Sequence, residues 1–160
     1  MRNLVFVMMT LATAMCLALL PMPVWAAWAR PAWVLLVLIY WTLVMPYQCN
    51  VGLAWCVGLS LDILTGTMLG LHAFAMTLVI YLVYRLHRRI HMYPMLQQAF
   101  SVFVFVLLYQ VIIYCLQGFI GEEPLSRYYW LGSVTSVILW PWLAVLLRDY
   151  SRWVRVGYAK

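Results

Sequence analysis

Charged side chains are scarce in this sequence. Its 160 residues include 10 Lys and Arg and 4 Asp and Glu, so that 9% are charged and 68% are hydrophobic. A soluble domain carries roughly 25% charged residues, because it must face water on all sides. The scarcity therefore excludes a soluble domain and predicts an all-α integral membrane protein. Few residues lie outside the apolar runs, so we expect a single transmembrane domain over residues 1–160.

The sequence also lacks the motifs of common enzyme chemistry. It contains no GxSxG, HExxH or P-loop pattern, and its four cysteines form no CxxC pair. His87 and His91 have the i, i+4 spacing of helical metal ligands, but the arginines around them repel a cation. Basic residues interleaved with aromatic ones, as nucleic-acid binding needs, are missing outside the segment ends. We predict a protein that is not an enzyme and has no cofactor, metal site or nucleic-acid partner.

Six apolar segments predict a compact bundle of six transmembrane helices. The first segment follows Arg2, and we interpret it as an uncleaved helix, although 24–26 resembles a signal-peptidase site. Asn50 is placed to cap the third segment, and 65–67 forms a turn after it. The expected segments are 4–20, 32–45, 51–65, 68–84, 95–117 and 128–147, and a basic cytoplasmic tail follows at 148–160.

The second and third segments are short for membrane-spanning helices. Their roughly 14–15 residues extend about 21–23 Å, against a hydrocarbon core of about 30 Å. Segments of this length either thin the bilayer locally or form a re-entrant hairpin within the protein. The sequence leaves both arrangements open.

Basic residues predict the orientation of the chain in the membrane. With six spanning segments, Arg30 and Arg127 fall outside, and the other basic residues fall on the cytoplasmic side. This asymmetry predicts a multi-pass protein with both termini in the cytoplasm. The basic loop after the fourth segment and the basic tail are expected to contact anionic lipids. The cytoplasmic set is Arg2, Arg85, Arg88, Arg89, Arg148, Arg152, Arg155 and Lys160.

A face of small residues surrounds one acid in the third segment. Asp62 is the only acidic residue within the long apolar segments, and four-residue steps from it reach Ala54, Gly58, Gly66 and Gly70. Each such step drifts by about 40° around a helix, so these residues cluster on one side. Small residues let helices approach closely, and a carboxylate in a membrane needs a partner. We predict that this face meets a partner helix or a ligand, or that Asp62 is hydrogen-bonded within the bundle.

Two further side chains near this face are open to interpretation. Trp55 lies inside the third segment, where it can pack against a partner helix or face lipid. His72 follows Asp62 by ten residues and is able to reach it across the turn, but we expect a histidine that is simply packed in the bundle.

Residues 30–84 resemble the rod shape-determining protein MreD family. The order and spacing of the shared residues carry this resemblance, rather than any single motif. At Ala32 the sequence departs from the polar or acidic residue that we expect the family often to have. The matching residues are Arg30-Pro31, the apolar run 33–41, Pro46, Val51-Gly52, Gly58, Leu61-Asp62, Gly66-Thr67, Leu69-Gly70 and, later, the run 138–142.

The resemblance implies a non-enzymatic inner-membrane component of the bacterial rod, or elongation, complex. Such a protein is expected to bind the transmembrane helix of MreC and to act indirectly with MreB, RodA and the partner transpeptidase of RodA in lateral peptidoglycan synthesis. The resemblance also implies a fold similar to the substrate-binding subunits of energy-coupling-factor transporters. The alternative is a small-molecule-binding or transport subunit with a pocket around Asp62. The candidate residues for a partner or a pocket are Ala54, Gly58, Asp62, Gly66, Gly70, Arg30 and Trp55.

Overall fold

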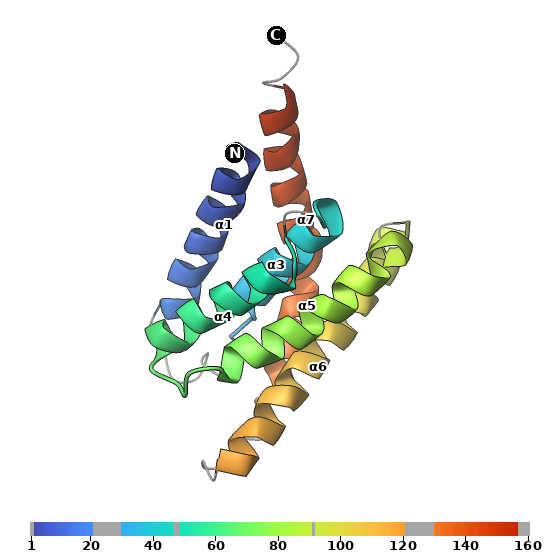
Figure 1. Ribbon diagram of the computed structural model, residues 1–160. Helices are drawn as coiled ribbons and strands as arrows, with labels where there is room; N and C mark the ends of the chain where they lie inside the picture. Colours follow the sequence, from blue (N-terminus) through green and yellow to red (C-terminus); the bar gives the residue numbers. More distant parts are fainter. Residues whose placement is uncertain (1, 21–29, 47–48, 91, 121–129, 157–160) are drawn as a thin grey trace.

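The computed structural model describes residues 2–20, 30–46, 49–90, 92–120 and 130–156 (Figure 1). Within these ranges the chain forms helices and no strand, which confirms the predicted all-α class. The 24–26 pattern, His91, Arg127 and Lys160 lie outside the described residues. The helices are α1 (Arg2–Leu19), α3 (Trp33–Val44), α4 (Val51–Thr65), α5 (Leu71–Ile90), α6 (Met95–Ile120) and α7 (Leu131–Val156).

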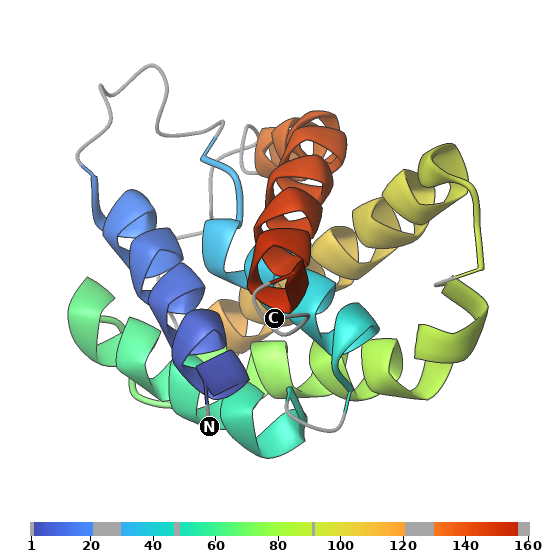
Figure 2. The ribbon, with the colours of Figure 1, turned by 90° about the horizontal axis from the view of Figure 1, so that it is seen from above.

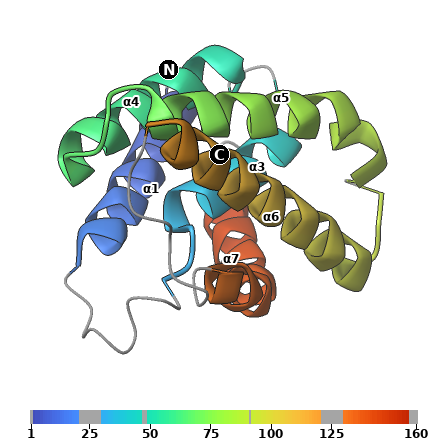
Figure 3. The ribbon, with the colours of Figure 1, turned by 90° about the horizontal axis from the view of Figure 1, so that it is seen from below.

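Helix α3 lies at the centre of the bundle. Every residue from Val34 to Leu43 is buried, as expected for a helix that is hydrophobic on all sides. Helices α1, α5 and α7 all pack against α3, and α4 lies beside α5 (Figure 3). Helix α1 contributes Val7 and Leu11 to the core. The indole N–H of Trp41 in α3 donates to the hydroxyl oxygen of Thr10 in α1 at 2.8 Å, which ties the first helix to the central one.

Two described helical stretches, Met95–Ile120 and Leu131–Asp149, are long and apolar enough to cross a membrane. Shorter apolar helices are Val5–Leu19, Trp33–Val44 and Val51–Thr65. Helix α3 has 12 residues, which extend about 18 Å, so it falls well short of the hydrocarbon core. Six full-length spans therefore stay a prediction.

Helix α4 has the bounds that the sequence predicts, Val51–Thr65. The side chain of Asn50 accepts a hydrogen bond from the Leu53 N–H at 3.2 Å, as expected of a helix N-cap. At the other end Gly66 has φ 68°, the left-handed conformation that ends many helices and favours glycine.

Three helices, α5, α6 and α7, extend beyond the ends of the predicted segments, α6 by three residues to Ile120. Residues 68–70 of the predicted fourth segment belong to the turn before α5. Helix α5 continues to Ile90, so the basic cluster after residue 84 forms its last turns and is not a loop. Cations at a helix C-terminus are stabilised by the helix dipole, which accounts for this extension. Helix α7 continues to Val156 and includes much of the basic tail. No glycine or proline occurs between 142 and 156 to end it.

Helices α4 and α5 are in close backbone contact at Gly58. A Cβ atom built on Gly58 would lie 2.3 Å from the Cα of Ala73 and 2.8 Å from its backbone nitrogen. No side chain fits there, because these atoms belong to the backbone of α5. The two antiparallel helices of the α4–α5 hairpin are therefore held closer together than any other residue at this position would allow.

We expect Gly58→Ala to destabilise the protein by about 1–3 kcal/mol or more, because the added methyl group overpacks against the α5 backbone. The matched control is Gly52→Ala in the same helix, where the new Cβ would meet only the Asn50 side-chain oxygen, at 3.5 Å. This control should keep or slightly raise stability, since alanine is the better helix former. Thermal unfolding of the purified proteins in detergent measures both. Equal melting temperatures for the two variants would contradict the close contact.

Candidate functional site

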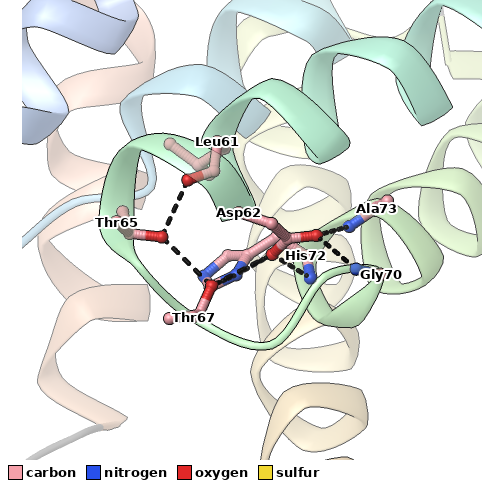
Figure 4. Close-up of polar contacts among 7 residues, drawn as sticks. All are labelled: Leu61, Asp62, Thr65, Thr67, Gly70, His72 and Ala73. Atoms are coloured by element: carbon pink, nitrogen blue, oxygen red, sulfur yellow. Dashed lines mark hydrogen bonds and ion pairs between the residues drawn. The ribbon is translucent and has the colours of Figure 1, made fainter.

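The carboxylate of Asp62, near the end of α4, points at the N-terminus of α5 (Figure 4). Asp62 is fully buried. Its Oδ2 accepts from the backbone N–H of Gly70 at 2.9 Å and of Ala73 at 3.3 Å. Its Oδ1 accepts from the backbone N–H of His72 at 2.9 Å. One side chain therefore binds three backbone N–H groups at the start of the next helix.

These contacts satisfy a need of α5. The first N–H groups of a helix have no acceptor within the helix, and the N-terminus carries a partial positive charge. The first turn of α5 contains no acidic residue. Asp62 supplies the missing acceptor and the negative charge from the neighbouring helix. The contact at Gly58, one turn earlier in α4, brings the two helices close enough for this.

Two side chains complete the hydrogen bonding of Asp62. The Nδ1 atom of His72 lies 2.8 Å from Oδ1, and the Thr67 hydroxyl donates to the same oxygen at 3.1 Å. The expectation of a histidine that is only packed in the bundle is therefore wrong. The reason is the turn between α4 and α5, in which Gly70 has φ 101° and lets the chain fold back onto Asp62.

The local hydrogen bonds continue to the end of α4. The Thr65 hydroxyl donates to the Leu61 carbonyl at 2.7 Å, and it lies 3.1 Å from the Thr67 hydroxyl (Figure 4). Sequence reasoning missed the roles of Thr65 and Thr67. The signal was present, because the Thr-Gly-Thr sequence begins three residues after Asp62, and a hydroxyl in such a turn is within reach of the carboxylate, as Thr67 shows.

This arrangement leaves Asp62 little capacity for other chemistry. A carboxylate offers about four lone-pair sites. In this structure the groups within hydrogen-bond distance are three backbone N–H groups, the Thr67 hydroxyl and His72 Nδ1. Among the described residues, no group of three or more His, Cys, Asp or Glu side chains is placed to hold a metal ion. The site holds two helices together.

The predicted small-residue face divides into two parts. Ala54, Gly58 and Asp62 are buried, and α5 of the same chain covers this part. A second protein would have to displace α5 to reach these three residues. Gly66 and Gly70 belong to the turn, where a Cβ would meet no atom within 4 Å.

The two remaining candidates lie apart from Asp62. Trp55 projects from α4 and is 42% exposed. Arg30 is exposed just before α3, and its guanidinium donates to the Leu20 carbonyl at the end of α1 at 2.9 Å. The structure therefore does not gather the seven candidates into one site.

At the start of α3, position 32 has no polar side chain, and a residue from another helix contributes the hydrogen bond. Ala32 makes no side-chain capping bond to the helix. Instead, the Ala32 N–H donates to the hydroxyl oxygen of Ser136 in α7 at 3.2 Å. A side chain distant in the sequence thus satisfies one donor at the N-terminus of the central helix.

A groove between α1 and α7 is a feature that the sequence did not predict. It has a volume of about 350 Å³, and α3 forms its floor. Thr13 and Leu17 line it from α1, Trp33 from α3, and Leu139 and Leu143 from α7. No periodic pattern in one helix signals it, because it arises where helices distant in the sequence diverge.

These features define a class of protein: a bundle of apolar helices, two of them long enough to span a membrane, whose buried acid has a structural role. The family model described as rod shape-determining protein MreD matches residues 1–150, and the chain belongs to that family. It is 30% identical over 146 residues to the "Rod shape-determining protein MreD" of Haemophilus influenzae, over 89% of this chain and 88% of that protein. No solved structure matches the chain.

Family membership confirms the resemblance seen in the sequence, and it gives the protein a role in rod shape determination. Proteins of this family are shape-determining structural components, and the family is not a known enzyme family. The apolar helices are compatible with a location in the membrane.

We expect Asp62→Asn to lower the free energy of unfolding by about 3 kcal/mol, since the amide loses the negative charge and turns an N–H donor toward other donors. Asp149→Asn, on the exposed part of α7, is the control and should change stability little. Chemical or thermal unfolding in detergent compares the two. Wild-type stability of Asp62→Asn would mean that the carboxylate does not hold α4 to α5.

Proposed function

We propose that this protein is a non-enzymatic inner-membrane component of the rod complex, and that it binds the transmembrane helix of MreC. Through MreC it acts on MreB, RodA and the partner transpeptidase of RodA, and so helps to regulate cell shape and lateral peptidoglycan synthesis. The observation that carries this proposal is the family match over residues 1–150.

The exposed side of α4 is the surface that best suits a partner helix. The small residues Gly52, Cys56 and Ser60 are all exposed there at four-residue spacing, which lets a second helix approach closely. Trp55 is 42% exposed and lies next to Cys56, midway along the row of small residues, and Ile63 is 69% exposed and lies beyond Ser60. We call this set the outer α4 stripe. A partner helix on the outer α4 stripe would leave the contacts between Asp62 and α5 intact.

The ends of the outer α4 stripe favour the same assignment. Toward the end of α4 the stripe leads into the turn that contains the exposed Gly66 and the half-buried Gly70, and we assign these two candidates to the edge of the same surface. A tryptophan at the centre of such a contact is a common source of binding energy. We therefore assign Trp55 as the anchor of the MreC contact.

Trp55→Ala is expected to weaken the binding of MreC in co-purification by about 30-fold or more, because a central tryptophan typically contributes about 2 kcal/mol or more to an interface. Trp142→Ala on α7 is the matched control: it removes an indole that is 75% exposed on another helix. This control should leave recovery unchanged. If Trp55→Ala retains MreC as well as Trp142→Ala does, the outer α4 stripe is not the interface.

The cellular role is tested in rod-shaped cells that lack the gene. We expect these cells to become spherical, and wild-type protein to restore rods. Trp55→Ala should restore them poorly, although it should accumulate in the membrane at the wild-type level. Rod shape in cells without the gene would contradict a role in shape determination.

We also infer that both termini lie in the cytoplasm. The start of α1 and the end of α7 lie at the same end of the bundle in Figure 1, and the basic C-terminal turns of α5 point toward that end. Arg85, Arg88 and Arg89 are exposed there and suit contact with anionic lipids. The end of α3 and the start of α4 lie on this side as well (Figure 1). This favours two separate segments that cross in opposite directions.

A topology reporter inserted at Asn50 should therefore give a cytoplasmic signal, as should one fused after the C-terminus. A reporter placed beside Arg30 should give a periplasmic signal and serves as the internal control. A periplasmic signal at Asn50 would instead support a re-entrant hairpin of α3 and α4.

A small-molecule pocket around Asp62 is not proposed as a second function. Groups of the same chain already surround the Asp62 carboxylate. The likeness to substrate-binding subunits of energy-coupling-factor transporters stays a prediction.

A further inference from the structure

The groove between α1 and α7 remains without a role in the proposed function. Both helices pack on α3, and they spread apart from each other toward the end of α1 and the start of α7 (Figures 1 and 2). Side chains from Thr10 to Leu17 line the groove on one side and side chains from Leu139 to Leu147 on the other, and nearly all of the lining is apolar. In a membrane such a space does not stay empty, because its walls would lose their contacts.

The dimensions of the groove limit what can fill it. Its volume is about 350 Å³. The stretch of α7 that lines it is about 12 Å long. A 12 Å length of helix with side chains, about 10–12 Å wide, takes up on the order of 1,000 Å³. The groove therefore suits a slender hydrocarbon chain better than a whole transmembrane helix.

A positive charge lies at one end of the groove. Arg30 binds the Leu20 carbonyl, one turn beyond the groove residue Leu17, and it precedes the groove residue Trp33 by three positions. Arg30 is exposed, and its guanidinium has five N–H donors, so that bonding to one carbonyl leaves capacity for an anion. A guanidinium suits phosphate in particular, because it can donate two parallel hydrogen bonds.

We propose that this groove binds one acyl chain of a membrane phospholipid, whose phosphate is held by Arg30. The second acyl chain stays in the surrounding bilayer. The groove residues accept any slender chain, so the preference for a phospholipid over other lipids comes from Arg30. This binding is independent of the contact with MreC, since the outer α4 stripe and the groove involve different helices.

The test uses full-length protein in a phosphate-free maltoside detergent. Phosphatidylglycerol with a photoactivatable diazirine midway along one acyl chain is the probe, and mass spectrometry maps its crosslinks. We expect the crosslinks to concentrate on the groove segments of α1 and α7. Diacylglycerol with the same modified chain lacks the phosphate and should label the groove about tenfold less.

Two pairs of variants separate the groove from its charged end. Thr13→Trp fills the groove and should abolish the crosslinks there, while Ala12→Trp, on an exposed position of α1 outside the groove lining, should keep them. Arg30→Gln should reduce labelling by phosphatidylglycerol about tenfold, to the level of diacylglycerol, and Arg88→Gln on α5 should not. Melting temperatures identify any variant that fails to fold. If Thr13→Trp does not fold, Arg30→Gln still tests the proposal, because Arg30 is exposed.

Several results would overturn the proposal. Crosslinks spread evenly over the exposed faces of α4 and α6 would show that the groove has no preference for the chain. Equal labelling of the groove in Ala12→Trp and Thr13→Trp would also show that the groove has no preference for the chain. Equal labelling of wild-type protein by the two probes would remove Arg30 from the site.

Discussion

The α4–α5 hairpin depends on one buried carboxylate. Asp62 binds the backbone N–H groups of Gly70, His72 and Ala73, so that the end of one helix supplies the cap of the next. This geometry requires the absence of a side chain at Gly58, which otherwise would push α5 away. Because α5 also packs on the central helix α3, the same interaction fixes how the hairpin sits in the bundle.

The internal contacts of Asp62 give this buried carboxylate a structural role. A carboxylate within an apolar segment usually marks a functional site, because its burial is costly without a partner. In this chain the partner is internal, and the energetic cost is offset by the charge and the donors of a helix N-terminus. We propose that other molecules bind instead at the outer α4 stripe and in the groove over α3. The chain belongs to a family of shape-determining proteins.

Local features of the fold could be predicted from the sequence because their causes are local. The bounds of α4 follow from Asn50 as a cap and Gly66 as a left-handed terminus, and both lie within a few residues of the helix. The predicted ends of α5 and α7 were too early, since a drop in hydropathy marks the edge of an apolar segment and not the end of a helix. The candidate site was predicted in part: Asp62 and Gly58 were identified, the reach of His72 to Asp62 was recognised but not expected to be used, and the role of Thr67 was missed.

The sequence by itself determined the membrane class, the helical fold, the family and the importance of the face around Asp62. Scarce charge, apolar segment length and the spacing of small residues are sufficient for the class, the fold and this face, and the resemblance of residues 30–84 to the family indicated the family. Only the tertiary structure decided what meets that face and where the bundle leaves a groove. What covers this face and where the groove lies both depend on the direction that each helix takes after the turn before it. At Gly66 and Gly70 that direction brings α5, and no second protein, against Asp62.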